Sequence, residues 1–215
     1  MNTQTRREIR FGLIALALSG LLLTLGAALR GPVNLPDLGS YIIPAALSPS
    51  YVRGWTIILV GFVLQLYGTF GLYRYLTYQA ENLIAFLAFV LRIAGVALFA
   101  PLITFLVVSG PVIADLYQQG HQEVIAIVEA NLTGGLGLAL LGVAAGAATI
   151  GAFLFAIAIW RHGRLPKWTA VLLVLGILLQ AVPSPTVAIE LLGLGLFFIS
   201  TSMIAWKGWQ DTEAG

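Results

Sequence analysis

Four polar side chains lie within otherwise apolar segments. They are the residues of this sequence whose charged or amide groups could bind an ion or a polar substrate. Arg92 is the only charged residue from Leu83 to Ser109, and Glu190 is the only charged residue of the last apolar segment. Gln65 and Gln180 lie in two further apolar segments. Intramembrane polar groups normally face the interior of a helical bundle, where they can bind an ion or a polar substrate. The sequence therefore predicts a candidate intramembrane polar site made of these four residues.

Arg92 requires an explanation of its own. An arginine at the centre of a membrane helix costs about 2.5–3.5 kcal/mol on translocon scales. At 1.5 Å per residue, Arg92 lies about 13 Å above the inner edge of the membrane and Glu190 about 24 Å above it. An ion pair or hydrogen-bond network across this gap needs tilt, both long side chains, or a bridging Gln180. The other interpretations are snorkelling to the inner headgroups and a substrate or ion site.

The composition indicates how these residues are positioned. The chain is 59% apolar and 9% charged, with a mean hydropathy of +0.95, which leaves too little polar surface for a water-soluble protein of this size. Apolar segments of the length of a membrane helix recur along it. They are residues 11–29, 55–72, 83–109, 135–160, 165–182 and 187–206. The sequence predicts an all-α, single-domain polytopic transmembrane bundle of six spans.

Two spans have unusual lengths. The fifth covers only about 27 Å and ends at the Pro183-Ser184-Pro185 turn, so a re-entrant hairpin is the alternative to a full crossing. The third exceeds the thickness of the hydrocarbon core, which predicts tilt or a kink at Pro101.

Basic residues predict the orientation, because lysine and arginine near short loops stay in the cytoplasm. An inside N-terminus places most of them inside: Arg6, Arg7, Arg10, Arg74, Arg161, Arg164, Lys167 and Lys207. Only Arg30 and Arg53 fall outside. We therefore predict a multi-pass protein of the cell inner membrane with both termini cytoplasmic. A signal peptide ending near Gly26 is the alternative for the first span, but its apolar run is longer than a usual signal core.

Two outer connections are long enough to hold structure. Residues 30–54 contain four prolines among apolar residues and predict either a lid or a packed filler. Residues 111–131 place apolar side chains near one helical face, with a break at Gly120, and predict an extracytoplasmic amphipathic helix between spans 3 and 4. It has no basic face, so we expect it to cover the outer surface rather than to bind headgroups.

The fourth span is rich in small residues. Gly142 and Gly146 are four apart, and Gly151 follows an alanine at the same spacing. Small residues at such intervals let helix backbones approach closely in lipid. We predict a packing helix, whose partner is another helix of this chain, a second copy in a homo-oligomer, or a different protein.

Several chemistries are excluded. The chain has no cysteine, and His121 and His162 are predicted on opposite sides of the membrane, so we expect no metal site. No nucleotide-binding loop and no serine-nucleophile motif are present, so no catalytic residue and no cofactor are predicted. The dispersed basic residues argue against nucleic acid and leave the lipid bilayer as the expected partner.

The turn from Trp160 to Trp168 reads WRHGRLPKW. Pro166 suits the first turn of a helix, and the two tryptophans suit the membrane boundary. This turn resembles the basic Leu-Pro-x-Trp turn of several families of bacterial multi-span membrane proteins known only as domains of unknown function. The resemblance extends from Gly151 to Gln180 and implies a bacterial inner-membrane protein, without implying an activity.

Three functions from different classes fit these observations. A non-enzymatic membrane subunit or accessory protein is favoured by the abundant small residues and the few polar ones. A small-substrate or ion transporter would line a cavity with Gln65, Arg92, Gln180 and Glu190. An intramembrane or lipid-modifying enzyme would need two catalytic groups at one depth, which the sequence does not plainly provide.

Overall fold

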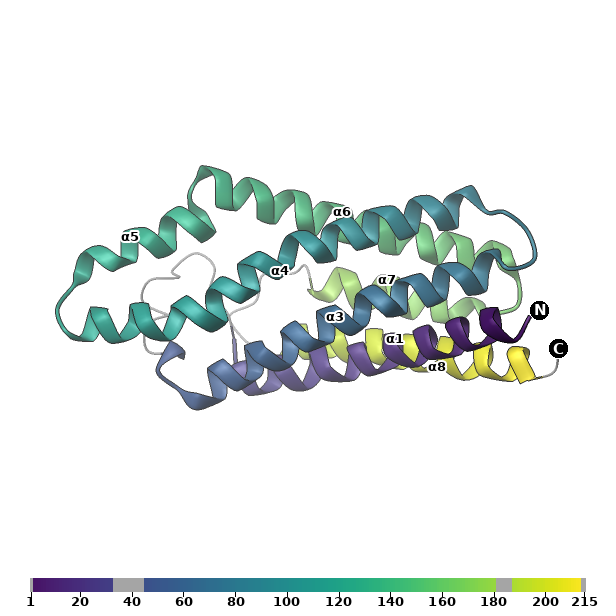
Figure 1. Ribbon diagram of the computed structural model, residues 1–215, viewed down its shortest axis with the longest axis horizontal. Coiled ribbons are helices and arrows are strands. Elements are labelled where there is room, and N and C mark those ends of the chain that lie inside the picture. The colour runs from purple at the N-terminus through teal and green to yellow at the C-terminus, as the bar shows by residue number, and fades with distance from the viewer. Residues whose placement is uncertain (1, 33–44, 181–186, 214–215) are drawn as a thin grey trace.

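The computed structural model describes residues 2–32, 45–180 and 187–213, and every regular element in them is a helix (Figure 1). The predicted all-α class is confirmed. The main helices are α1 (Thr3–Arg30), α3 (Pro49–Thr77), α4 (Leu83–Gln118), α6 (Gly135–His162), α7 (Lys167–Gln180) and α8 (Val187–Glu213). Between α4 and α6 lie a 3₁₀ turn (Gln122–Val124), α5 (Ile125–Val128) and a π-helical turn (Glu129–Thr133).

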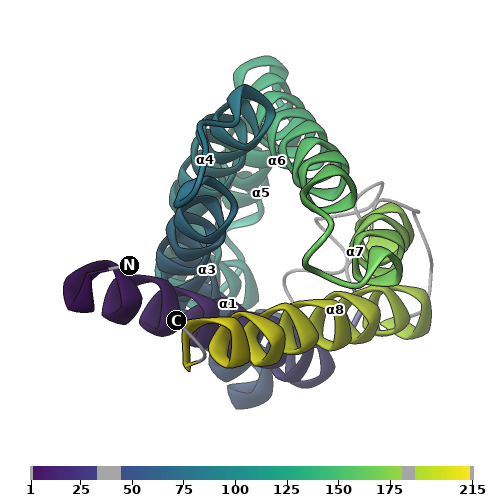
Figure 2. The same ribbon diagram turned by 90° about the vertical axis from the view of Figure 1, so that its right-hand side faces the viewer.

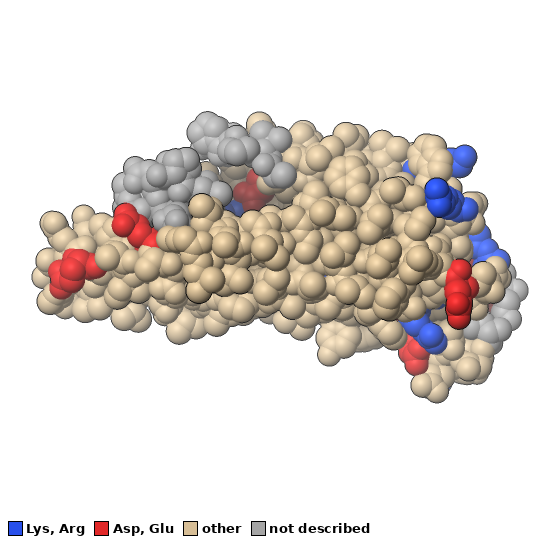
Figure 3. Space-filling model, turned by 90° about the horizontal axis from the view of Figure 1, so that it is seen from above, with Lys and Arg blue, Asp and Glu red and all other residues tan. Residues whose placement is uncertain are grey.

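Five of these helices, α1, α3, α4, α6 and α8, are long and apolar enough to cross a membrane. α7 is shorter, with 14 residues, and the Pro183-Ser184-Pro185 turn after it lies outside the described residues. Large apolar side chains are exposed along the helices, and one face of the molecule shows a broad uncharged middle between charged ends (Figure 3). An apolar exterior of this extent fits lipid rather than water, so the chain is a multi-pass membrane protein.

The main helices form a closed ring. Each of α1, α3, α4, α6 and α7 packs against the next, and α8 packs against both α7 and α1 (Figure 2). Both termini lie at one end of the bundle (Figure 1). Arg10 near the start of α1 donates its Nε–H to Thr212 Oγ1 near the end of α8, at 2.8 Å. We call this end the terminal end, and the other the opposite end.

Glycines at the helix interfaces bring neighbouring helices into backbone contact. A Cβ on Gly12 of α1 would lie 2.5 Å from Gly71 Cα of α3, and a Cβ on Gly95 of α4 would lie 2.5 Å from the Ala148 backbone nitrogen of α6. Real side chains do not approach so closely, so only glycine fits these positions. Such contacts supply the dispersion energy that replaces a hydrophobic driving force between helices in lipid.

The predicted packing glycines of α6 divide into two groups. A Cβ on Gly151 would lie 2.7 Å from the backbone nitrogen of Arg92, so Gly151 packs within the chain. A Cβ on Gly142 or Gly146 would meet nothing within 4 Å, so these two glycines do not pack against the described residues. A second copy or a partner protein at their surface stays a prediction.

This difference gives a matched test on one helix. Gly151→Val is expected to lower the apparent melting temperature of the detergent-purified protein strongly, because the new side chain must push α4 away from α6. Gly146→Val should leave the melting temperature unchanged, since its side chain meets open space. Unfolding is monitored by intrinsic tryptophan fluorescence during heating. Equal decreases of the melting temperature in the two variants would contradict the packing described here.

The predicted amphipathic helix over residues 111–131 is wrong as a single element. α4 continues through Pro101 and Pro111 to Gln118, over 36 residues, because Ile113 and Ala114 are buried in an apolar cluster with Tyr51 of α3. Gly120, with φ +100°, then reverses the chain. The remaining residues form the short turns before α6, and their buried valines join the same cluster.

Candidate functional site

Arg92 lies in the half of α4 that is nearer the terminal end of the bundle. It is nine residues after Leu83, the first residue of α4, a separation of about 13 Å at 1.5 Å per residue. On the neighbouring helix, the contact residue Gly151 is about 16 Å from His162, the last residue of α6. Both counts place Arg92 near the middle of a hydrocarbon core about 30 Å thick.

The Arg92 side chain extends into the interior of the ring. Its Nη1 donates to the backbone oxygen of Ala148 on α6, at 2.9 Å. Its Cζ lies 5.9 Å from the ring centroid of Phe197 on α8, and α8 is not a ring neighbour of α4. Ala148 is farther from the terminal end than Gly151, which touches the Arg92 backbone. The guanidinium therefore reaches across the ring at mid-depth instead of snorkelling to the headgroups of the terminal end.

No acidic side chain compensates this charge in the part of the chain that the structure describes. The ion pairs there are formed by Arg10, Arg30, Arg74, His121 and Lys207. The Ala148 carbonyl is the one hydrogen-bond acceptor of Arg92 among these residues. An uncompensated guanidinium at mid-depth is costly, and such groups in membrane proteins mark substrate or ion pathways.

The predicted pair between Arg92 and Glu190 is wrong, because Glu190 binds Arg30. Arg30 Nη2 lies 2.5 Å from Glu190 Oε1 and 2.6 Å from Oε2. The Arg30 side chain is 3% exposed and that of Glu190 34%, and Trp55 covers the guanidinium, with its ring centroid 4.6 Å from Arg30 Cζ. This cluster joins α1, α3 and α8 at the opposite end of the bundle.

Helix ends favour this pairing. Arg30 is the last residue of α1 and Glu190 is in the first turn of α8. The negative end of the α1 dipole favours the cation, and the positive end of the α8 dipole favours the carboxylate. The sequence analysis did not include Arg30 among the candidate site residues, because it placed Arg30 in an outer loop.

Gln65 of α3 is a second polar group buried at mid-depth. Its side chain is 1% exposed, and its Oε1 has no hydrogen-bond partner among the residues that the structure describes. A buried amide oxygen without a partner costs about 1–3 kcal/mol. A bound ligand that donates a hydrogen bond would remove this cost.

Aromatic pairs between α3 and α4 show that Gln65 and Arg92 lie at similar depths. Ring centroids are 6.0 Å apart in the pair Phe62–Phe99 and 6.2 Å apart in the pair Phe70–Phe89. In these antiparallel helices, the two pairs place Arg92 level with Gly68. Gln65 is therefore about one helical turn, roughly 5 Å, farther from the terminal end than Arg92.

Gln180 does not link Arg92 to Glu190. Its Nε2 donates to the Gly176 oxygen of its own helix at 3.0 Å, and its backbone nitrogen lies against Gly193 of α8. Of the four predicted site residues, the structure thus brings Arg92 and Gln65 to one depth and places Glu190 and Gln180 elsewhere.

A second polar cluster closes the ring at the terminal end. The Tyr75 hydroxyl donates to Asp211 Oδ2 at 2.5 Å, and Asp211 Oδ1 lies 2.9 Å from Lys207 Nζ. The Tyr75 ring also lies 5.6 Å from the imidazole of His162. These residues come from α3, α6 and α8, so the cluster holds three helices together. The sequence analysis did not predict these contacts.

No protein-family model, curated protein or solved structure matches this chain. The chemistry of the site must therefore be inferred from its own residues. Among the described residues, no three histidine, aspartate or glutamate side chains gather to hold a metal ion. Arg92 and Gln65 supply hydrogen-bond donors, one positive charge and an amide, which suit binding of an anion rather than bond-breaking chemistry.

Proposed function

We propose that this protein is a membrane transporter that binds a small anion at mid-depth, between Arg92 of α4 and Gln65 of α3. The observation that carries the proposal is the half-buried guanidinium of Arg92, which has no acidic partner in the described chain. Transporters commonly hold their substrate near the bilayer midplane, where the two halves of the protein meet. An anion would neutralise Arg92 there.

The geometry of the guanidinium narrows the class of anion. Arginine presents five N–H donors in a planar fork, and Arg92 uses one of them on Ala148. The remaining donors match two oxygens of a carboxylate, phosphate or sulfate group. The orphaned Oε1 of Gln65 favours an anion that also carries a hydroxyl or another donor.

We also propose that the chain crosses the membrane six times, with both termini in the cytoplasm. The membrane is the inner membrane of the cell. Tyr75 lies beside His162 at the terminal end, whereas Glu190 lies beside Arg30 at the opposite end. These two positions support a sixth crossing between His162 and Val187, through α7. The concentration of basic residues at the terminal end supports its cytoplasmic placement.

An accessory or structural role is the second candidate. It is favoured by the glycine contacts that pack the helices closely and by the open faces of Gly142 and Gly146, which leave room for a partner. The two candidates differ in whether a small anion reaches Arg92. An enzymatic role has less support, because neither Arg92 nor Gln65 is a nucleophile or a general base at neutral pH.

Thermal unfolding with a panel of anions tests the proposal. The detergent-purified protein is heated in acetate, lactate, citrate, phosphate, sulfate or chloride at one ionic strength. We expect one oxyanion to raise the melting temperature of the wild type, and the same anion to enter liposomes that contain the protein. Gln65→Leu and Arg92→Gln should weaken both effects, whereas the exposed control Arg161→Gln should not.

The transporter proposal fails if Arg92→Gln and Arg161→Gln respond identically to every anion in the panel. It also fails if a stabilising anion enters liposomes with wild-type protein no faster than it enters empty liposomes. The second result, with binding intact, would favour the accessory role.

A further inference from the structure

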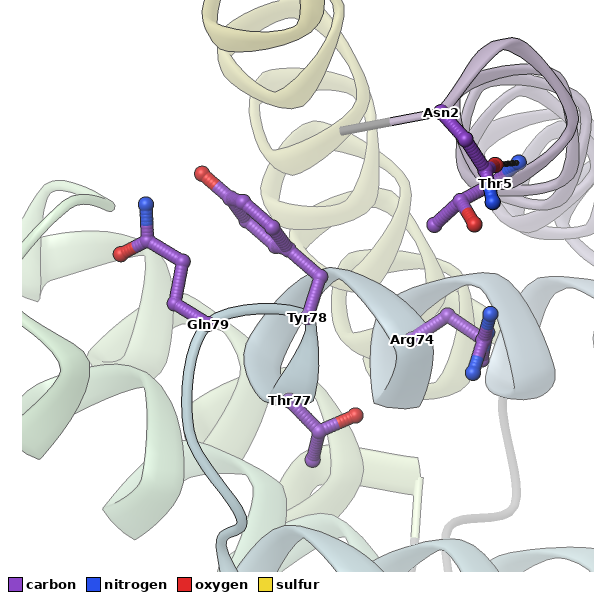
Figure 4. A pocket seen from close by; sticks show the side chains of 6 residues that line it. All are labelled: Asn2, Thr5, Arg74, Thr77, Tyr78 and Gln79. Carbon is purple, nitrogen blue, oxygen red and sulfur yellow. Dashed lines mark hydrogen bonds between the residues drawn. The ribbon is translucent and has the colours of Figure 1, made fainter.

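A pocket opens at the terminal end of the bundle, between the start of α1 and the end of α3 (Figure 4). Its volume is about 460 Å³, and all the side chains that line it are polar. They are Asn2, Thr5, Arg74, Thr77, Tyr78 and Gln79. The lining carries one guanidinium, three hydroxyls and two amides, without a carboxylate. The Tyr78 hydroxyl and the Gln79 amide oxygen also accept hydrogen bonds from Arg164, which adds a second guanidinium beside the pocket. These are groups that bind a phosphate.

Arg74 has donors available for such a ligand. Its Nε is buried without a hydrogen-bond partner among the described residues. Its nearest carboxylate oxygen, Glu8 Oε2, lies 3.5 Å from Nη2, which is longer than the 2.7–2.9 Å of a tight charge-assisted bond. The pocket adjoins both the first turn of α1, whose dipole favours an anion, and the last turn of α3, whose dipole disfavours one, so Arg74 supplies the attraction.

The surface next to the pocket points to a lipid as the source of the phosphate. Tyr67 is seven residues before Arg74, so it lies two turns away on the same face of α3, toward the middle of the bundle. Tyr67 is 57% exposed and Phe11 of α1 is 66% exposed. Their rings meet edge to face with centroids 6.4 Å apart. A polar pocket at the membrane boundary therefore continues into an exposed aromatic surface at the depth of acyl chains.

We propose that this pocket binds the phosphate of an anionic phospholipid, with Arg74 as its main contact and an acyl chain along Phe11 and Tyr67. This site is independent of the mid-depth site, and it would anchor the seam between α1 and α3 to one leaflet of the membrane.

Native mass spectrometry of the detergent-purified protein provides the test, with short-chain phosphatidylglycerol as the lipid probe. Inorganic phosphate and glycerol 3-phosphate are the soluble probes. Arg74→Gln is expected to weaken lipid binding about tenfold, a change of about 1.4 kcal/mol. Glu8→Gln should strengthen it, because it releases Arg74 from its carboxylate. Arg161→Gln, which removes an exposed arginine of the same end, is the matched control and should leave binding unchanged.

The opposite signs expected for Arg74→Gln and Glu8→Gln keep the test informative if one variant folds poorly. Unchanged binding in both folded variants would overturn the proposal. Equal losses in Arg74→Gln and Arg161→Gln would also overturn it, since they would indicate only a general attraction to basic residues. Inorganic phosphate binding as tightly as the lipid would overturn the lipid as the source of the phosphate.

Discussion

Replacing Glu190 by leucine is expected to lower the free energy of unfolding by about 3–5 kcal/mol, the usual result of leaving a buried charge without its partner. The Arg30 side chain is 3% exposed, and its Nε already lacks a hydrogen-bond partner among the described residues. Without the Glu190 carboxylate, the Trp55 ring would be the remaining contact of the guanidinium among the described residues. The loss is measured by unfolding the purified protein from mild detergent with increasing dodecyl sulfate.

Replacing Arg30 instead of Glu190 should lower the free energy of unfolding by less. Arg30→Met leaves the Glu190 carboxylate, which is 34% exposed and can be hydrated at the membrane boundary. The double variant Arg30→Met/Glu190→Leu should regain most of the lost stability, because apolar replacements of a buried pair are often neutral. Arg53→Met removes an exposed arginine near the same end and is the control. A Glu190→Leu variant as stable as Arg53→Met would show that the pair contributes little.

The helical spans were predictable because a bilayer imposes strong rules on sequence. Each backbone polar group inside lipid must be satisfied within its own helix, so apolar segments and helices coincide. The predicted span 135–160 became α6 (Gly135–His162), and the predicted span 187–206 became α8 (Val187–Glu213). Both observed helices extend past the predicted ends, because helices continue through the membrane boundary where hydropathy falls.

The end of α4 was less predictable, because a proline in a membrane protein can either end a helix or lie within one. The predicted third span ended at Ser109, yet α4 continues through Pro111 to Gln118. Burial of Ile113 and Ala114 against α3 outweighs the backbone hydrogen bond that the proline removes. This packing depends on tertiary structure, which the local sequence does not display.

The pairing of Glu190 with Arg30 could almost have been predicted from the sequence. The depth estimate already separated Glu190 from Arg92 by about 10 Å, and an inside N-terminus puts Arg30 at the outer end of the first span. Counting Arg30 as a loop residue hid it, although it is the last residue of α1. The orphaned Oε1 of Gln65 could not have been found in this way, because hydrogen-bond satisfaction is a property of the folded structure.

Replacing Arg92 by methionine is expected to have the opposite effect on stability from the loss of Glu190. Arg92 has no acidic partner in the described chain, so its removal takes away a charge that is costly inside a membrane and gives up one hydrogen bond, to Ala148. Arg92→Met should therefore unfold at the same dodecyl sulfate fraction as the wild type or at a higher one. Stabilisation by the oxyanion, in contrast, should disappear.

This pairing of a stability gain with a functional loss separates a ligand site from a structural one. A structural arginine that holds α4 and α6 together would lose stability on replacement, and Arg92→Lys would restore only part of it, because lysine lacks the planar fork. If Arg92 binds a ligand, the Arg92→Met variant should be more stable than the wild type. The Arg92→Lys variant should still bind the anion, but more weakly. Gln65→Leu should follow Arg92→Met in both measurements, because it removes a buried amide oxygen that has no hydrogen-bond partner in the described chain. A clear loss of stability in Arg92→Met would remove the anion site and return Arg92 to a packing role.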